Sequence, residues 1–304
     1  MLLIESLYRL KRNLINFYKK YFTTEGTYTC ILPDKIYLKM LYKQRTGKKL
    51  NLKNPKTFNE KQNWLKLYDR RPEYTIMVDK YKAREYIAEK IGEEYLVPLL
   101  GVWDSPDEID FDALPNEFVL KCNHDNGVII CRDKSELDIE KVKEELRGRL
   151  KRDYYKKLRE WPYKDVPRKI ICEKLMNNTN GKDLYDYKLF SFNGKVKLIE
   201  VNSERFTGSC KEDHFDVEWN HFDVTGRPSS GIKLQKPSFL YDMINIAEGV
   251  SRNIPFLRVD FNLWDDYLFV GEFTFFYGGS MKLFNEPWET RLGEWIELPK
   301  KHRR

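Results

Sequence analysis

The sequence predicts an α+β fold with mainly antiparallel sheets. Three segments have the pattern of β-hairpins, at residues 117–131, 186–201 and 257–276. Two of them turn at Asn-Gly, which is a strong hairpin signal. Charged or amphipathic segments with a helical period separate the hairpins. Strands that pair within hairpins and helices that follow them favour α+β over alternating parallel βαβ units.

The N-terminal part of the chain is expected to be helical. Along residues 2–22, apolar residues recur at steps of three and four, and most Arg and Lys residues lie off that stripe. This basic amphipathic helix either lies on a membrane surface or packs on the body of the domain. Residues 34–100 are expected to be helices with loops. Thr57 is an N-cap candidate with Glu60 three residues later, and a second helix is expected from about 79 to 91.

The strands begin at residue 117. A strand over 117–122, a turn over 123–127 and a return strand over 128–131 form the first hairpin. The charged segment 138–159 is predicted to be one solvated covering helix without chemistry. Further elements are expected in this order: a strand over 170–175, hairpin strands over 186–192 and 195–201, an irregular polar stretch over 203–236, and a helix over 237–253.

The bulk properties indicate a globular protein of 304 residues, long enough for a large core. The net charge of +7 suits a polyanionic partner, and no zinc-finger spacing or strand-stacking RNA motif is present, so no nucleic acid is expected. The five cysteines form no CxxC pair, which predicts free thiols in a reducing cytoplasm. No stretch approaches the ~20 apolar residues of a transmembrane helix, and the N-terminus lacks the features of a signal peptide.

The third hairpin carries the clearest chemistry. Arg258 and Asp260 alternate with apolar residues and therefore share one strand face, as do Glu272 and Thr274 on the return strand. With a three-residue turn, Asp260 lies opposite Glu272, and Arg258 lies opposite Thr274. Two facing carboxylates repel unless a cation lies between them, and Mg²⁺ prefers such oxygen ligands. The alternative is a solvent-facing salt-bridged surface.

Lysines elsewhere in the sequence favour the magnesium site over the salt-bridged surface, because they add cations within or beside ordered elements. Lys121 and Lys188 lie in predicted strands, where Lys is disfavoured. Lys121 precedes the polar Gly-containing turn 123–127, which is able to present backbone N–H groups to phosphates. An ordinary hairpin turn is the alternative for that segment.

Taken in order, these pieces resemble the ATP-grasp superfamily, which clamps ATP between two α+β subdomains. Asp79-Lys80 is similar to the first nucleotide-binding lysine, and Phe118–Lys121 with its turn to the second lysine and its phosphate loop. Further segments, namely 54–61, 186–188, 236–237 and 256–260, resemble the branch named for teichuronopeptide biosynthesis, which belongs to bacterial surface-polysaccharide pathways. The resemblance covers roughly residues 35–290.

The resemblance implies roles for specific residues. Arg258 and Lys188 would be catalytic, and Asp260, Glu272 and Thr274 would hold Mg²⁺. The residues expected to bind ATP are Lys80, Lys121, Asn123, His124, Gly127, Glu173, Lys174, Leu175, Asp186 and Lys188. Thr274 departs from the Asn that many family members have there, which puts a second metal ion in doubt.

The resemblance also implies a domain organisation. The expected parts are a basic N-terminal helix (1–34), a helical region (35–110), a small ATP-grasp subdomain with the phosphate loop (111–175), a large subdomain with the metal site (176–295) and a basic tail (296–304). The Rossmann-like domain that precedes many ATP-grasp cores is not evident in residues 1–110.

The activity that follows from the resemblance is a carboxylate–amine ligase that acts through an acyl phosphate. The expected partners are ATP, a carboxylate-bearing glycan or sugar, and an amine such as an amino acid or amino sugar. A sugar kinase is the alternative, and a glycosyltransferase is a third reading that lacks an Asp-x-Asp motif. Arg205, His214 and Trp219 lie in a polar stretch that either contacts the acceptor or is a surface excursion. The basic chain ends would allow peripheral contact with an anionic membrane.

Overall fold

The computed structural model describes residues 32–176, 185–203, 210–264 and 267–300. These residues divide between two compact units, 1–50 and 51–304. The first unit contains α2 (Asp34–Thr46), which ends at Gly47 with φ 71°. The helix predicted for residues 2–22 lies outside the described residues, as do Cys30, Arg205 and residues 301–304 of the basic tail.

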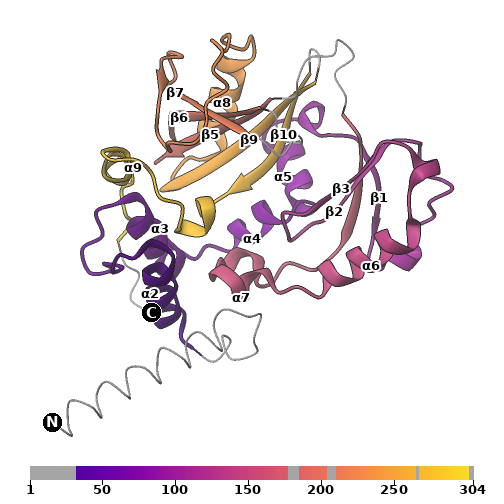
Figure 1. The fold of residues 1–304 in the computed structure, drawn as a ribbon, viewed down its shortest axis with the longest axis horizontal. Helices are drawn as coiled ribbons and strands as arrows, with labels where there is room; N and C mark the ends of the chain where they lie inside the picture. The colour runs from indigo at the N-terminus through magenta and orange to yellow at the C-terminus, as the bar shows by residue number, and fades with distance from the viewer. Residues whose placement is uncertain (1–31, 177–184, 204–209, 265–266, 301–304) are drawn as a thin grey trace, which may run out of the picture. The chain divides into compact units, whose positions relative to one another are not determined.

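The second unit contains two antiparallel sheets (Figure 1). The smaller sheet has the order β1-β4-β2-β3. Its strands are β1 (Leu99–Trp103), β2 (Phe118–Cys122), β3 (Val128–Cys131) and β4 (Ile170–Lys174). The larger sheet has the order β10-β9-β5-β6-β7-β8. Its strands are β5 (Asp186–Phe192), β6 (Lys195–Ser203), β7 (Lys211–Phe215), β8 (His221–Phe222), β9 (Phe256–Trp264) and β10 (Tyr267–Thr274). The α+β fold with mainly antiparallel sheets is confirmed.

Helices precede and cover these sheets. They are α3 (Phe58–Tyr68), α4 (Glu73–Val78), α5 (Lys82–Lys90), α6 (Ile139–Leu150), α7 (Tyr154–Leu158), α8 (Leu240–Val250) and α9 (Trp288–Trp295). Short 3₁₀ turns are η2 (Glu93–Tyr95), η3 (Pro106–Glu108), η4 (Lys134–Glu136), η5 (Trp161–Tyr163) and η6 (Tyr277–Ser280). The predicted capping box is present, because Thr57 accepts from the Glu60 N–H and Glu60 reaches back to the Thr57 N–H.

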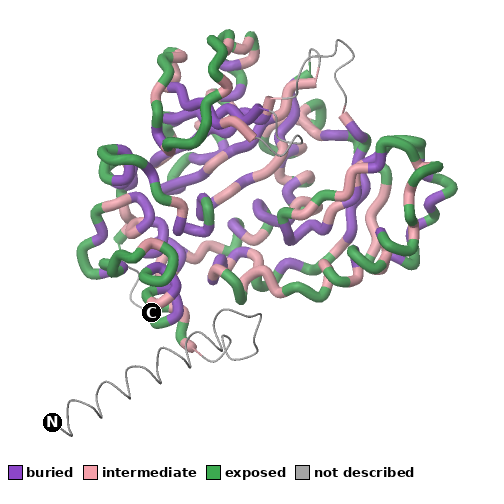
Figure 2. The backbone as a smooth tube through the Cα atoms, in the orientation of Figure 1, coloured by how far each residue is buried: buried purple, intermediate pink, exposed green. Residues whose placement is uncertain are grey.

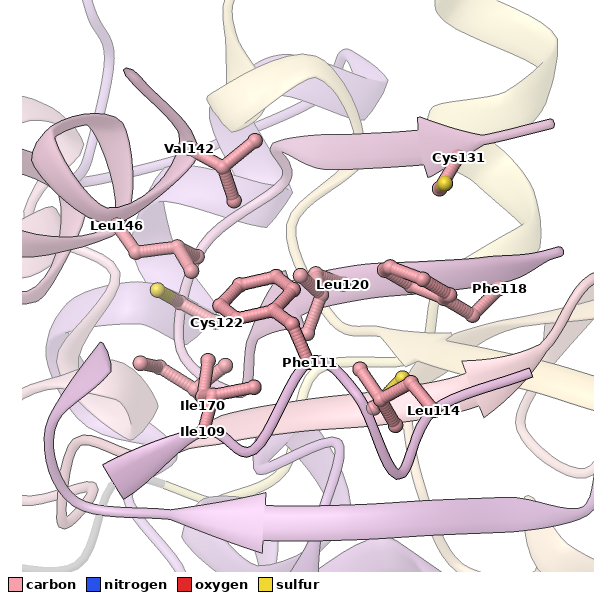
Figure 3. Close-up of a cluster of buried hydrophobic side chains, with 11 residues drawn as sticks. Ile109, Phe111, Leu114, Phe118, Leu120, Cys122, Cys131, Val142, Leu146 and Ile170 are labelled. Atoms are coloured by element: carbon pink, nitrogen blue, oxygen red, sulfur yellow. The ribbon is translucent and has the colours of Figure 1, made fainter. Parts of the chain in front are cut away.

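The core of the smaller sheet forms under α6. Leu146 and Val142 of the helix pack against Phe118, Leu120 and Cys172 of the strands (Figure 3). Burial of such side chains contributes roughly 1.5–3 kcal/mol each before conformational entropy is subtracted. The helix therefore fixes the outer face of the sheet and leaves its other face for a cleft. Figure 2 shows that buried backbone also runs through the strands of the larger sheet.

Three sequence predictions need correction. The predicted helix 138–159 is two helices, since α6 ends at Leu150 and Asp153 caps the separate helix α7 through the Lys156 N–H. The segment 203–236, predicted to be irregular, contains β7 and β8 at the edge of the larger sheet. The predicted helical region 35–110 contains β1, which pairs with β4. β8 has two residues, and β1 is short with a pairing partner distant in sequence, so periodicity was a weak guide to these strands.

The predicted thiol state is also confirmed for four of the five cysteines. Cys122, Cys131 and Cys172 are buried and Cys210 is partly buried, and all four are free. Burial raises the pKa of Cys122 and of Cys172 to about 12. These thiols are therefore core residues rather than nucleophiles.

Candidate active site

A cleft of about 200 Å³ lies between the two sheets. Its walls come from α4, α5, β2, β3 and β4 on one side and from β5, β9 and β10 on the other. Lys80, Lys121, Glu173, Asp186 and Glu272 all line it. Residues predicted separately from five stretches of sequence therefore meet in one place.

The β9–β10 hairpin forms one end of this cleft. Asp260 pairs with Glu272 and Arg258 pairs with Thr274, as predicted. The cause differs from the prediction, because Tyr267 pairs with Trp264 across a two-residue connection and a bulge between Val270 and Glu272 restores the register. The bulge contains Gly271, where a Cβ atom would lie 3.0 Å from the Asn262 side-chain nitrogen.

Arg258 holds both carboxylates of the hairpin. Its Nε donates to Asp260 Oδ1 at 2.6 Å, and its Nη2 donates to Asp260 Oδ2 at 2.7 Å and Glu272 Oε1 at 2.9 Å. Asp260 is 7% exposed, whereas the Glu272 side chain is 36% exposed. The hairpin therefore presents one buried and one accessible carboxylate beside a single guanidinium.

A row of charged residues continues from the hairpin across the sheet. Glu272, Asp260, Lys188, Glu200 and His214 are successive cross-strand partners on β10, β9, β5, β6 and β7. Cross-strand partners project from the same face of a sheet. The Lys188 ammonium lies 3.2 Å from Asp260 and 3.3 Å from Asp186. The face towards the cleft is therefore polar, and α8 packs against β5, β6 and β9 on the apolar face.

Burial and neighbouring charges act in opposite directions on the pKa values of the ionisable residues in and beside this row. Burial raises the pKa of Asp260, although Arg258 and Lys188 oppose that effect. Burial acts to lower the pKa of Arg258, but Asp260 and Glu272 outweigh it and raise that pKa. The pKa of Lys188 is raised in the same way, since Asp260 and Asp186 outweigh its burial. Both cations therefore stay charged in the physiological range.

Two lysines reach the cleft from the other side. The Lys80 ammonium donates to the Asp125 carbonyl at 2.7 Å and lies 3.7 Å from Glu272 Oε2, so it joins the 123–127 turn to the hairpin. The Lys121 ammonium lies 2.5 Å from Glu173 Oε2. Glu173 also contacts Arg84 of α5, a cleft residue that the sequence analysis missed.

The predicted phosphate turn is built by side chains that hold its backbone. Asn123 is fully buried, and its amide donates to Asp79 and to the Pro167 carbonyl at 2.8 Å each. His124 is 2% exposed, and burial lowers the pKa of its imidazole. At Gly127 the guanidinium of Arg149 occupies the space of a Cβ atom. The predicted nucleotide contacts of Asn123, His124 and Gly127 remain predictions.

Three more of the residues predicted to bind ATP also lie at the cleft. Lys174, Leu175 and Asp186 line it, and the Lys174 ammonium lies 4.9 Å from the centre of the Trp264 ring. Asp186 is 9% exposed and bonded to Lys188. Their roles towards a nucleotide remain predictions that this placement permits.

Two of the three residues predicted to contact the acceptor, His214 and Trp219, lie among the described residues. Arg205 lies outside the described residues. His214 is 2% exposed and its Nε2 lies 3.6 Å from Glu200. Trp219 stacks on Phe215 at 4.2 Å, and its indole N–H donates to the Leu234 carbonyl. Trp219 therefore has a packing role in the β7–β8 connection.

A second polar cluster, which was not predicted from the sequence, lies beside Arg258. The Arg258 guanidinium lies 5.4 Å from the centre of the Tyr277 ring, and the Tyr277 hydroxyl donates to Glu200 Oε2 at 2.5 Å. The Lys282 ammonium contacts Tyr277 and Glu212. Burial acts to raise the pKa of Glu200, but His214, Lys282 and Lys188 outweigh it and lower that pKa. A charged residue between Ile199 and Val201 was the available sequence signal.

A match to a protein-family model identifies the family to which the chain belongs. The model of the TupA-like ATP-grasp family matches residues 60–297. The chain belongs to the TupA-like ATP-grasp family. This match covers both sheets, the cleft and all the predicted cleft residues.

Comparison with solved structures gives distant matches. The chain has 14% identity and a TM-score of 0.44 with an L-amino acid ligase from Bacillus licheniformis, covering 73% of this chain and 49% of that one. For D-alanine–D-alanine ligase from Bacillus anthracis with ATP, the identity is 19% and the TM-score 0.36, over 66% and 53% of the two chains. The chain thus spans about half the length of these two proteins. No curated protein matches the chain.

ATP and Mg²⁺ are the cofactors of the ATP-grasp family, and this site fits both. Asp260 and Glu272 offer oxygen ligands side by side, with Thr274 on the same strand face as Glu272. Lys80, Lys121 and Arg258 offer positive charge for a triphosphate around them.

No helix among the described residues is long and apolar enough to cross a membrane.

Proposed function

We propose that the protein is an ATP-dependent carboxylate–amine ligase of bacterial surface-polysaccharide biosynthesis. The observation that carries the proposal is the meeting of Arg258, Asp260 and Glu272 with Lys80 at one end of the cleft. The family match supports the nucleotide chemistry.

In the proposed first step, a carboxylate oxygen of the acceptor attacks the γ-phosphorus of ATP, and the bond to the bridging oxygen of ADP breaks. Arg258 would stabilise the transferring phosphoryl group because its charge is fixed at that position by Asp260 and Glu272. Lys188 would hold Asp260 ionised. When bound by Asp260, Glu272 and Thr274, Mg²⁺ would neutralise phosphate charge.

In the second step, the amine attacks the acyl carbon, phosphate leaves, and the amine loses a proton to give the amide. Arg258 would stabilise the oxyanion of the tetrahedral intermediate and the departing phosphate. The acceptor proposed here is a uronic-acid carboxyl group of a surface glycan, and the amine is that of an amino acid or amino sugar.

The cellular setting and the subdomains are part of the same proposal. We place the reaction in the cytoplasm, with the basic chain ends against an anionic inner leaflet. Residues 111–175 together with β1 would form the small subdomain of the clamp, and residues 176–295 the large one.

Hydroxylamine distinguishes the ligase from a kinase, because it converts an acyl phosphate into a stable hydroxamate. The assay supplies MgATP, hydroxylamine and a panel of uronic acids and oligouronates. Hydroxamate with matching phosphate release is the expected result, and it should be absent in Arg258→Ala. A stable phosphorylated sugar that does not react with hydroxylamine would establish the kinase instead.

A further inference from the structure

The segment 151–168, which follows α6, carries a concentration of positive charge. It contains seven Lys or Arg residues and three Asp or Glu residues, a net +4, in a chain whose total is +7. Six of these cations are exposed: Lys151, Arg152, Lys156, Lys157, Lys164 and Arg168. Of the three acids, Glu160 is buried, Asp153 caps α7 and pairs with Lys156, and Asp165 is exposed. More than half of the excess charge therefore lies on 18 residues.

Aromatic rings lie among these cations. Tyr154 and Tyr163 are partly buried, with ring centres 4.8 Å apart. The Tyr155 ring, also partly buried, has Arg159 at 5.3 Å and Lys164 at 5.7 Å from its centre. A partly exposed aromatic ring flanked by cations offers an apolar face and a charge partner at the same place.

Stacked aromatic rings hold the segment close to the β9–β10 hairpin. Trp161 of η5 stacks on Tyr74 at 5.9 Å, and Tyr74 stacks on Phe275 at 4.0 Å. Phe275 directly follows Thr274 at the end of β10. Two rings thus separate the segment from the strand that carries Glu272.

Further contacts fix its two ends. The buried Lys66 ammonium donates to the Leu158 carbonyl at 3.0 Å and the Gly279 carbonyl at 2.9 Å, which joins α7 to the turn after β10. Arg168 donates to the Leu150 carbonyl, and Arg149 contacts Asp125 of the 123–127 turn. Burial, Glu160 and Glu272 together raise the pKa of Tyr163 well above its usual value, as expected for a ring near the hairpin. The segment therefore lies between the 123–127 turn and the β9–β10 hairpin.

We propose that segment 151–168 is the binding surface for an acidic oligosaccharide, whose carboxylates pair with the exposed cations and whose sugar rings lie against Tyr155. This surface rests on the proposed function, because it would deliver a uronic-acid carboxyl group to Arg258. Partly buried aromatic rings favour a saccharide over a membrane, since a membrane-binding helix would present exposed apolar side chains instead.

The test uses the full chain without nucleotide and a fluorescein-labelled decagalacturonate as probe, followed by fluorescence anisotropy. The patch variant is Lys157→Glu with Lys164→Glu. The control variant is Lys53→Glu with Lys233→Glu, which makes the same charge change at exposed lysines outside the segment. We expect the patch variant to bind about tenfold more weakly and the control less than about twofold more weakly. Equal losses in both variants would mean general charge attraction and would overturn the proposal.

A second variant separates saccharide recognition from charge alone. Tyr155→Ala should weaken decagalacturonate binding several-fold and leave the binding of inorganic polyphosphate unchanged. Circular dichroism melting checks that each variant folds. Unchanged decagalacturonate binding in Tyr155→Ala would refute the stacking role. Loss of sedimentation with anionic vesicles by the patch variant, with decagalacturonate binding intact, would identify a membrane surface instead.

The proposed function can fail separately from this surface. ADP titration of the same proteins reports on the nucleotide cleft, which none of the four substitutions in the two double variants touches. A wild-type protein that binds decagalacturonate but no ADP would retain the saccharide surface and contradict the ligase.

Discussion

Glu160 should make the protein less stable as the pH rises. Glu160 is 5% exposed and directly precedes η5. Burial raises its pKa from 4.5 to about 7, Lys66 and Arg258 oppose that rise, and Glu272 adds to it. The folded protein therefore holds this proton at pH values where the unfolded chain has already lost it.

The direction and size of the effect follow from this difference. Below pH 4.5 both states are protonated and the contribution to stability is complete. As the pH rises through 7, the unfolded state is favoured by its earlier ionisation. Each tenfold difference in proton affinity corresponds to about 1.4 kcal/mol, so the two pKa values imply a loss of about 3 kcal/mol.

Urea unfolding at pH 5 and pH 8 measures this loss in the wild type and in Glu160→Gln. The variant keeps the shape of the side chain and cannot ionise, so titration of all other groups cancels in the comparison. We expect the wild type to lose about 2.5 kcal/mol more than the variant between the two pH values, because a small part of the loss already lies below pH 5. A difference within roughly 0.5 kcal/mol, the order of the extrapolation error, would refute the reasoning.

Two further predictions concern packing and nucleotide binding. In Gly293→Ala the new Cβ would lie 2.2 Å from the Lys56 carbonyl oxygen, so we expect a loss of about 1–3 kcal/mol in thermal unfolding. Gly249→Ala, in a helix with nothing within 4 Å, is the matched control and should not destabilise; equal losses would contradict the clash. Lys121→Met should weaken ADP binding by about 10–100-fold in calorimetry, because a charge-assisted phosphate contact is lost. Lys169→Met, whose ammonium pairs with Asp104 on the surface, should bind ADP normally, and a similar loss there would exclude a specific role for Lys121.

The hairpins could be predicted because their information is local. Alternation and Asn-Gly turns placed β2, β3, β5 and β6 within a residue or two. The pairing of Asp260 with Glu272 was also correct, but for a different reason. A two-residue connection and a bulge at Gly271 together shift the register by the same amount as the predicted three-residue turn.

The features that could not be predicted depend on distant contacts. β1 pairs with β4, about 70 residues later in the chain, and β8 has only two residues. The burial of Glu160 depends on α4, η5 and the turn after β10 coming together. Its sequence neighbours Arg159 and Trp161 gave no periodic signal for a buried carboxyl group.

We propose above all that Asp260 and Glu272 hold Mg²⁺ against a nucleotide in the cleft. Calorimetric titration with a non-hydrolysable ATP analogue, with and without Mg²⁺, tests it most directly in the wild type and in Glu272→Gln. Glu272 is the accessible carboxylate, and its loss leaves Arg258 bonded to Asp260. We predict that Mg²⁺ strengthens analogue binding at least about tenfold in the wild type and by less than about twofold in the variant. The same Mg²⁺ dependence in both proteins would contradict the account.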